Sequence, residues 1–107
     1  MKYQREFFRI SIERTGQLRR GTDTAACQIT QLTPYGIGLS TDLLVTCGEA
    51  IELEFQLTSQ CPIRCTVLVT HAAPPILGGR ITAISPEHRT WIAQFLAQHA
   101  AISLTAL

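Results

Sequence analysis

The sequence predicts an all-β domain that ends in one helix. Six short runs alternate apolar and polar residues and are separated by glycine, proline and other turn residues. This spacing is typical of an antiparallel barrel or sandwich. The C-terminal part instead repeats its apolar residues at helical spacing. A chain of 107 residues, 46% of them hydrophobic, can bury one core, so we expect a single domain.

The first three predicted strands span residues 10–19, 27–32 and 37–41. The first begins where Ile10 and Ile12 alternate with polar residues, which indicates a half-buried strand. A turn at Gly21-Thr22-Asp23 separates it from the second strand, where the alternation resumes. Pro34 ends the second strand because proline has no N–H to donate to a neighbour.

The last three predicted strands span residues 51–57, 63–70 and 78–84. The segment Ile51–Leu57 alternates most regularly, with Glu and Gln between its apolar residues, so its polar side chains should face solvent. The fifth strand is more apolar and ends before Pro74-Pro75. The sixth begins at Gly78-Gly79.

A C-terminal helix is predicted over about residues 86–100. Ser85 is a good N-cap, Pro86 suits the first helical position, and Glu87 favours the positive end of the helix dipole. The apolar face is formed by Trp91, Ile92, Phe95 and Leu96. We expect this face to pack on the strands rather than to bind a cofactor or a membrane.

Positive charge is concentrated at the N-terminal end of the chain. Residues 1–20 hold six Lys or Arg and two Glu, and the other residues hold three Arg and six Asp or Glu, so the net charge of +1 divides into +4 and −3. Such a confined basic segment suits a small phosphate ligand better than a long nucleic acid. A solvated basic arm is the alternative. We expect residues 1–9 to form a flexible arm and residues 10–107 to form the folded domain.

The four cysteines, Cys27, Cys47, Cys61 and Cys65, do not have the spacing of a zinc site. We expect them to be free thiols that pack as small hydrophobic residues. The three histidines are scattered, and no nucleophile is paired with a base, so the sequence predicts neither a metal site nor an enzyme. No signal peptide or membrane-spanning run is recognisable, so we expect a cytoplasmic protein without membrane insertion.

Two short segments carry the candidate binding residues. Arg5 and Arg9 place two guanidinium groups four residues apart, and each group can donate paired hydrogen bonds to phosphate or to the O6/N7 edge of guanine. Gln31, Thr33 and Gly36 place an amide, a hydroxyl and a glycine at a turn, where glycine allows a positive φ and close backbone approach. Solvated arginines and ordinary turn chemistry are the alternative interpretations.

Together these segments resemble the PilZ domain family, bacterial receptors for the second messenger cyclic di-GMP. The family pattern is R-x-x-x-R followed by [D/N]-x-S-x-x-G. The segment Arg5-Glu6-Phe7-Phe8-Arg9 matches the first motif fully. The segment Gln31-Leu32-Thr33-Pro34-Tyr35-Gly36 matches the second in place, with Gln31 for Asp or Asn and Thr33 for Ser. Residues 79–81 and 84–89 are similar to the family's last strand and the start of its C-terminal helix.

The resemblance implies a six-stranded antiparallel PilZ-like β-barrel with a terminal helix, no cofactor, and a regulatory rather than enzymatic function. It implies that Arg5 and Arg9 hold phosphate and guanine, that Gln31 and Thr33 contact the base or the sugar–phosphate edge, and that Gly36 permits close approach. The neutral Gln31 should weaken binding of cyclic di-GMP by about tenfold, because a hydrogen bond loses its charge assistance. The expected output is a conformational change or binding of a downstream protein. The alternative is a degenerate module that binds a protein partner without nucleotide, in pilus or exopolysaccharide regulation.

Overall fold

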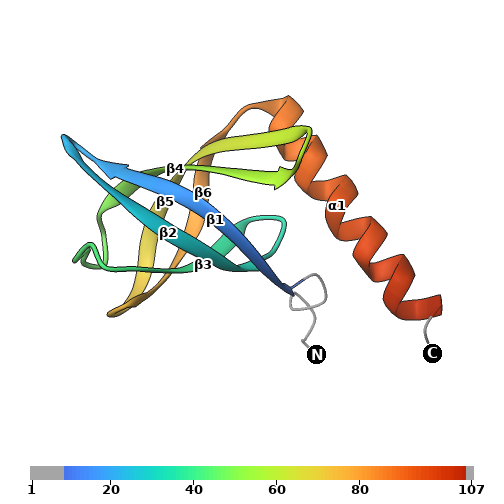
Figure 1. The fold of residues 1–107 in the computed structure, drawn as a ribbon, viewed down its shortest axis with the longest axis horizontal. Helices are drawn as coiled ribbons and strands as arrows, with labels where there is room; N and C mark the ends of the chain where they lie inside the picture. The colour runs from blue at the N-terminus through green and yellow to red at the C-terminus, as the bar shows by residue number, and fades with distance from the viewer. Residues whose placement is uncertain (1–8, 106–107) are drawn as a thin grey trace.

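Six strands close into an antiparallel barrel, and one helix follows them (Figure 1). The computed structural model describes residues 9–105. The elements are β1 (Ile10–Arg20), β2 (Asp23–Leu32), β3 (Gly36–Thr41), β4 (Ala50–Thr58), β5 (Cys61–Ala73), β6 (Ile76–Ile84) and α1 (Pro86–Thr105). Residues 1–8, which include Arg5 and nearly all of the predicted arm, lie outside the described residues.

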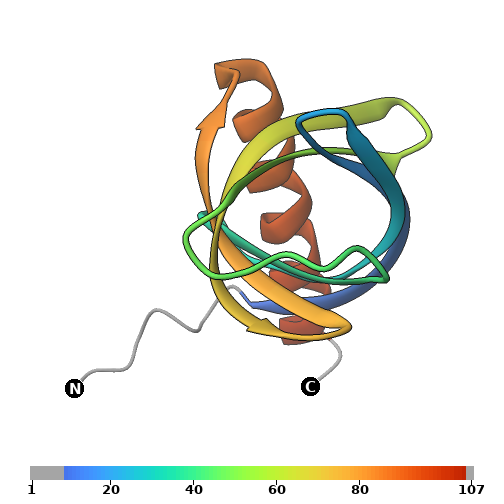
Figure 2. The ribbon, with the colours of Figure 1, turned by 90° about the vertical axis from the view of Figure 1, so that its left-hand side faces the viewer.

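The strands follow one another around the barrel in the order β1-β2-β3-β6-β5-β4. Pairing of Gly16–Arg19 on β1 with Glu52–Phe55 on β4 closes the ring, which Figure 2 shows nearly end-on. The predicted six-stranded barrel with a C-terminal helix is therefore confirmed, and the sandwich alternative is wrong. The β3–β6 pairing departs from sequence order, because β4 and β5 lie between these strands in the chain.

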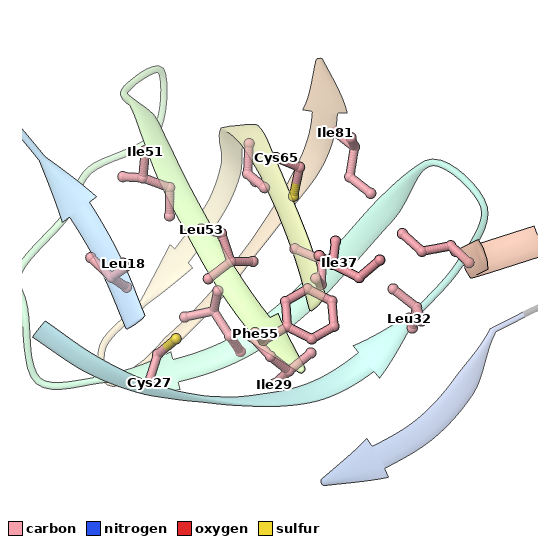
Figure 3. Close-up of a cluster of buried hydrophobic side chains, with 14 of the residues drawn as sticks. Leu18, Cys27, Ile29, Leu32, Ile37, Ile51, Leu53, Phe55, Cys65 and Ile81 are labelled. Carbon is pink, nitrogen blue, oxygen red and sulfur yellow. The ribbon is translucent and has the colours of Figure 1, made fainter. Parts of the chain in front are cut away.

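The inward-facing side chains fill the barrel with aliphatic residues and one central phenylalanine. Figure 3 shows Ile29, Leu53 and Phe55 pointing into this interior from β2 and β4. On β4, buried and exposed residues alternate along the whole strand, as the sequence predicts. Leu18, Ile29 and Leu53 are completely buried, so each contributes about 1.5–3 kcal/mol of burial free energy to the folded state.

Helix α1 begins as the sequence predicts. The Ser85 hydroxyl accepts a hydrogen bond from the backbone N–H of His88 (3.1 Å), which is the N-cap interaction. The helix continues to Thr105 rather than ending near residue 100. Within residues 9–105, no helix combines the length and apolar character needed to cross a bilayer.

One face of α1 packs on the barrel. Ile92, Phe95 and Leu96 are buried in the same core as the strands, which confirms the predicted packing face. The guanidinium of Arg14 on β1 lies 5.6 Å from the centre of the Phe95 ring and donates a 2.8 Å hydrogen bond to the Leu57 carbonyl of β4. Arg14 therefore joins β1, β4 and the helix beyond the short β1–β4 pairing.

Part of the basic charge in residues 1–20 serves the fold. Arg19 forms an ion pair with Glu52 across the β1–β4 pairing, and Arg20 forms one with Asp23 (3.1 Å) across the turn between β1 and β2. Asp23 begins β2 rather than ending the turn, and the turn itself needs only two residues, with the glycine at φ +60°. These two arginines are therefore engaged by carboxylates of the barrel.

The cysteines differ in their surroundings. Cys27 and Cys65 are buried in the core, and desolvation raises the pKa of the Cys27 thiol to about 11 and the pKa of Cys65 to about 12. Cys61 is half-buried against the same core. Cys47 is exposed, so the expectation that all four pack as small hydrophobes is wrong for this residue. Cys47 lies in the connection between β3 and β4, where no sheet covers it.

We expect Gly79→Ala to destabilise the barrel by about 1–3 kcal/mol, the usual cost of overpacking. A Cβ at this position would lie 2.4 Å from Val67 Cγ1 and 2.6 Å from the Leu68 carbonyl, so β5 and β6 would have to separate. The matched control is Gly78→Ala, whose Cβ would make an ordinary 3.7 Å contact with His71. Urea denaturation measures both, and equal stability of the two variants would contradict the packing argument.

Candidate functional site

A groove with a volume of about 540 Å³ crosses the outer face of the barrel over β2, β3, β6 and β5. We call it the glycine groove, because glycines on two strands form much of its floor. Its lining includes Arg9, Gln31, Thr33, Gly36, Gly38, His71 and Gly78. The groove exists because the outward positions on β3 and β6 carry no bulky side chains at its centre.

Four of the five predicted site residues line this one groove. Arg9 comes from the start of the barrel, Gln31 from the end of β2, and Thr33 and Gly36 from the turn that follows. Arg5 lies outside the described residues. Two segments more than twenty positions apart in sequence thus meet at one surface, since Ile10 pairs with Leu32 where β1 and β2 run together.

The Thr33 hydroxyl holds the turn between β2 and β3. Its Oγ1 accepts hydrogen bonds from the backbone N–H groups of Gly36 (2.8 Å) and Tyr35 (3.2 Å), while the Thr33 N–H donates to the Gly36 carbonyl (3.0 Å). This is the turn chemistry of a serine or threonine side chain. The hydroxyl therefore acts on the shape of the turn, as the alternative interpretation of this segment anticipates.

Gly36 is needed for space rather than for its φ angle. Among the described residues, the glycines with positive φ are Gly21 and Gly48, so the expectation of a positive φ at Gly36 is wrong. A Cβ at Gly36 would lie 3.0 Å from the Gly79 carbonyl of β6 and 3.3 Å from Thr33 Oγ1. The absence of a side chain at Gly36 therefore lets the turn lie against β6, while the close approach of a ligand at this residue stays a prediction.

Gln31 lies beside a glycine on the neighbouring strand. Gln31 pairs with Gly38, and a Cβ on Gly38 would lie 3.3 Å from Gln31 Cβ and 3.6 Å from its Oε1. The missing side chain at Gly38 thus gives the exposed amide of Gln31 room to lie along the groove. An amide placed in this way can donate to and accept from the edge of a planar base.

The charges on the groove wall favour an anion. Among the described lining residues, Arg9 and His71 are the groups that can carry charge, and no Asp or Glu is present. A second groove, over β1, β4 and β5, includes both Glu54 and Arg64, which pair at 2.7 Å and balance each other. The glycine groove, unlike this second groove, therefore combines cationic groups with an absence of carboxylates among its described lining residues.

The first turn of α1 contacts the turn between β2 and β3 (residues 33–36), which we call the motif turn. Arg89 donates a hydrogen bond to the Pro34 carbonyl (3.4 Å), and its guanidinium lies 5.7 Å from the centre of the Tyr35 ring. The Tyr35 carbonyl also accepts a 2.8 Å hydrogen bond from the Ile81 N–H of β6. The turn therefore contacts both the first turn of the helix and β6.

Comparison with known protein families matches residues 3–98 to the PilZ domain. The chain belongs to the PilZ domain family. PilZ domains are regulatory binding domains, and the family is one of cyclic di-GMP receptors. No curated protein matches this chain in sequence.

Two solved structures are similar to this PilZ domain. One is the Bacillus subtilis inhibitor of motility (MotI/DgrA), with a TM-score of 0.79 and 14% identity over 92% of this chain and 52% of that one. The other is the PilZ domain of CeSA from a cellulose-synthesizing bacterium, with a TM-score of 0.66 and 10% identity over 84% of this chain and 95% of that one. The chain spans about half the length of MotI/DgrA, and at these identities the likeness shows the fold.

Sequence reasoning missed the far wall of the groove. His71 and Gly78 come from β5 and β6, and they reach the motif residues only because β3 pairs with β6. The contact between Arg89 and the motif turn was also missed, because it joins residues 55 positions apart in the chain. The adjacent glycines at the start of β6 were the one available signal, because glycine within a strand often marks close approach of another group.

Thr33→Val should loosen the motif turn, because it removes the acceptor of two backbone N–H groups at nearly constant volume. We expect a loss of about 1 kcal/mol in stability and faster amide exchange at Gly36. Thr33→Ser, which keeps the hydroxyl, is the matched control. Unchanged exchange at Gly36 in the valine variant would show that the turn holds without the side chain.

Proposed function

We propose that this PilZ domain binds cyclic di-GMP in the glycine groove. The observation that carries the proposal is the meeting of Arg9, Gln31, Thr33 and Gly36 around one groove with no described carboxylate on its wall. These are residues of both family motifs, brought together from separate segments. A dianionic ligand with two purine edges suits a groove that offers a guanidinium, an amide and exposed backbone.

In this proposal each motif residue has a distinct part. Arg9, with Arg5 from the preceding segment, donates hydrogen bonds to phosphate oxygens and to the O6/N7 edge of guanine. Gln31 contacts a base edge through its amide. Thr33 and Gly36 shape the turn, so their contribution to affinity is indirect.

The proposed output runs through the motif turn. A ligand that contacts residues 31–36 alters the surroundings of Pro34 and Tyr35, and both contact Arg89 at the start of α1. The helix is therefore the element whose position or partner binding reports occupancy. Since a nucleotide second messenger acts inside the cell, we place this function in the cytoplasm.

The alternative function is binding of a protein partner without nucleotide, as a degenerate PilZ module. It is favoured by Gln31, which stands where the family has Asp or Asn; relative to Asp, it exchanges a charge-assisted bond worth about 1.5–3 kcal/mol for a neutral one worth about 1 kcal/mol. A calorimetric titration with cyclic di-GMP, with GTP as the control compound, separates the two functions. Absence of heat with cyclic di-GMP would support the partner-binding alternative.

Arg9→Ala should weaken binding of cyclic di-GMP by about tenfold to a hundredfold, because a truncated guanidinium leaves a phosphate or guanine edge unpaired. Arg5→Ala should behave alike. Arg19→Ala is the matched control, since it removes an arginine of β1 that forms an ion pair with Glu52 of β4 and does not line the glycine groove. Calorimetry gives the affinities. Equal affinity of the Arg9 and Arg19 variants would exclude Arg9 from the site.

Gln31→Asp should tighten binding several-fold, because a carboxylate makes a charge-assisted hydrogen bond to the guanine N–H edge. The added charge also repels the ligand phosphates, but the cationic groups of the groove reduce that repulsion, and we expect a net gain of about 1 kcal/mol. Gln31→Ala should bind more weakly than the parent. If titrations show the same affinity for all three proteins, Gln31 does not contact the ligand.

A further inference from the structure

The strand register places five outward positions in one row across the barrel. Ser11 pairs with Gln31, Gln31 with Gly38, Gly38 with Gly78, and Gly78 with His71. Two polar side chains, Gln31 and His71, thus flank a floor of two glycines. Since adjacent strands lie about 4.8 Å apart, the α-carbons of Gln31 and His71 are separated by about 14 Å along the sheet.

A β-bulge turns His71 toward the groove. Val67 and Val69 are buried, so strict alternation along β5 would direct His71 into the barrel. The register shifts between Val69 and His71, where two residues on β5 advance for one on β6, and His71 is consequently exposed on the outer face. Bulges often re-aim a side chain beside a functional site. The bulge therefore gives an independent reason to assign His71 to the groove.

We propose that His71 is a further ligand-binding residue, whose protonated imidazole donates a hydrogen bond to a phosphate of the bound nucleotide. This assignment rests on the proposed function. His71 lines the same groove as Arg9 and lies on its opposite side from Gln31. An imidazolium on the far wall gives the second end of a dianionic ligand a cationic partner that the two family motifs do not supply.

The charged groups around His71 leave it available to the ligand. On the groove wall itself, Arg9 is the other charged group among the described residues. On β6, the next outward-facing charged residue is Arg80, which lies opposite Gly36 of β3 and Leu68 of β5 in the strand register.

Two carboxylates lie in the connection that precedes β4, Asp42 and Glu49. Glu49 is engaged elsewhere: hydrogen bonds from Thr46 lower the pKa of its carboxyl, and it also contacts Arg20 at 3.4 Å. Asp42 is exposed at the end of β3 and does not line the groove. A phosphate is therefore the anion best placed to meet the imidazolium.

Binding and protonation are coupled in this arrangement. Histidine changes its charge between about pH 5 and 8, whereas a phosphodiester stays ionised and arginine stays protonated over that range. A phosphate favours the protonated imidazole, so the affinity for cyclic di-GMP increases as the pH falls. If a ligand raises the pKa of a group by one unit on binding, its affinity for the protein with that group protonated is tenfold higher than with the group neutral.

The test is a calorimetric titration with cyclic di-GMP at about pH 6 and about pH 8. We expect the parent protein to bind about threefold to tenfold more tightly at the lower pH. His71→Gln should lose this dependence and bind at both pH values as the parent does at the higher one. His71→Lys, with a fixed positive charge, should bind tightly at both. The matched control is His99→Gln on α1, which should keep the parent profile.

The outcomes separate this inference from the proposed function. Binding with the parent pH profile in His71→Gln overturns the role of His71 and leaves the nucleotide function intact. Affinity reduced equally at both pH values in that variant shows a neutral contact and overturns the phosphate contact proposed here. No binding of cyclic di-GMP by any variant at either pH overturns the proposed function itself, and this inference with it.

Discussion

The pairing of β3 with β6 is the contact on which both the barrel and the groove depend. It joins strands that are separated in the chain by β4 and β5, and it brings the motif turn against the strands that carry the far wall. Glycine makes this pairing possible at two points. Gly79 has no space for a side chain between β5 and β6, and Gly36 has none between the turn and the Gly79 carbonyl. One packing constraint therefore fixes the fold and the distance between the groove walls.

The arginines show how the same side chain divides between fold and site. Arg14, Arg19 and Arg20 are held by carbonyls, carboxylates or an aromatic ring of the barrel and helix. Arg9, at the start of the same segment, lines the groove instead. The total positive charge of residues 1–20 is therefore a poor predictor of ligand binding. It indicates the binding residues only after the arginines that stabilise the barrel have been subtracted from it.

Local patterns predicted the elements, and long-range pairing decided the rest. The alternation in β4 and the Ser85 cap depend on neighbours in sequence, so they could be recognised in advance. The exposure of Cys47 and the outward turn of His71 could not. The first depends on a connection that no sheet covers, and the second on a bulge that reverses the alternation of β5. For the candidate site, the sequence motifs identified the wall that carries Gln31, Thr33 and Gly36, and the strand order identified the opposite wall, which carries His71 and Gly78.

Gln31 and His71 bear on each other through the bound ligand rather than through a direct interaction of charges. A carboxylate at position 31 would lie across the two glycines from His71, with the two α-carbons about 14 Å apart along the sheet, well beyond the Debye length of about 8 Å in physiological salt. Salt therefore screens most of its effect on the imidazole, and stabilisation of the protonated form falls to the phosphate whichever residue stands at position 31. Substitutions at the two positions should consequently have nearly additive effects on the free protein. A departure from additivity in the affinity for cyclic di-GMP would then measure coupling through the ligand that both side chains are proposed to contact.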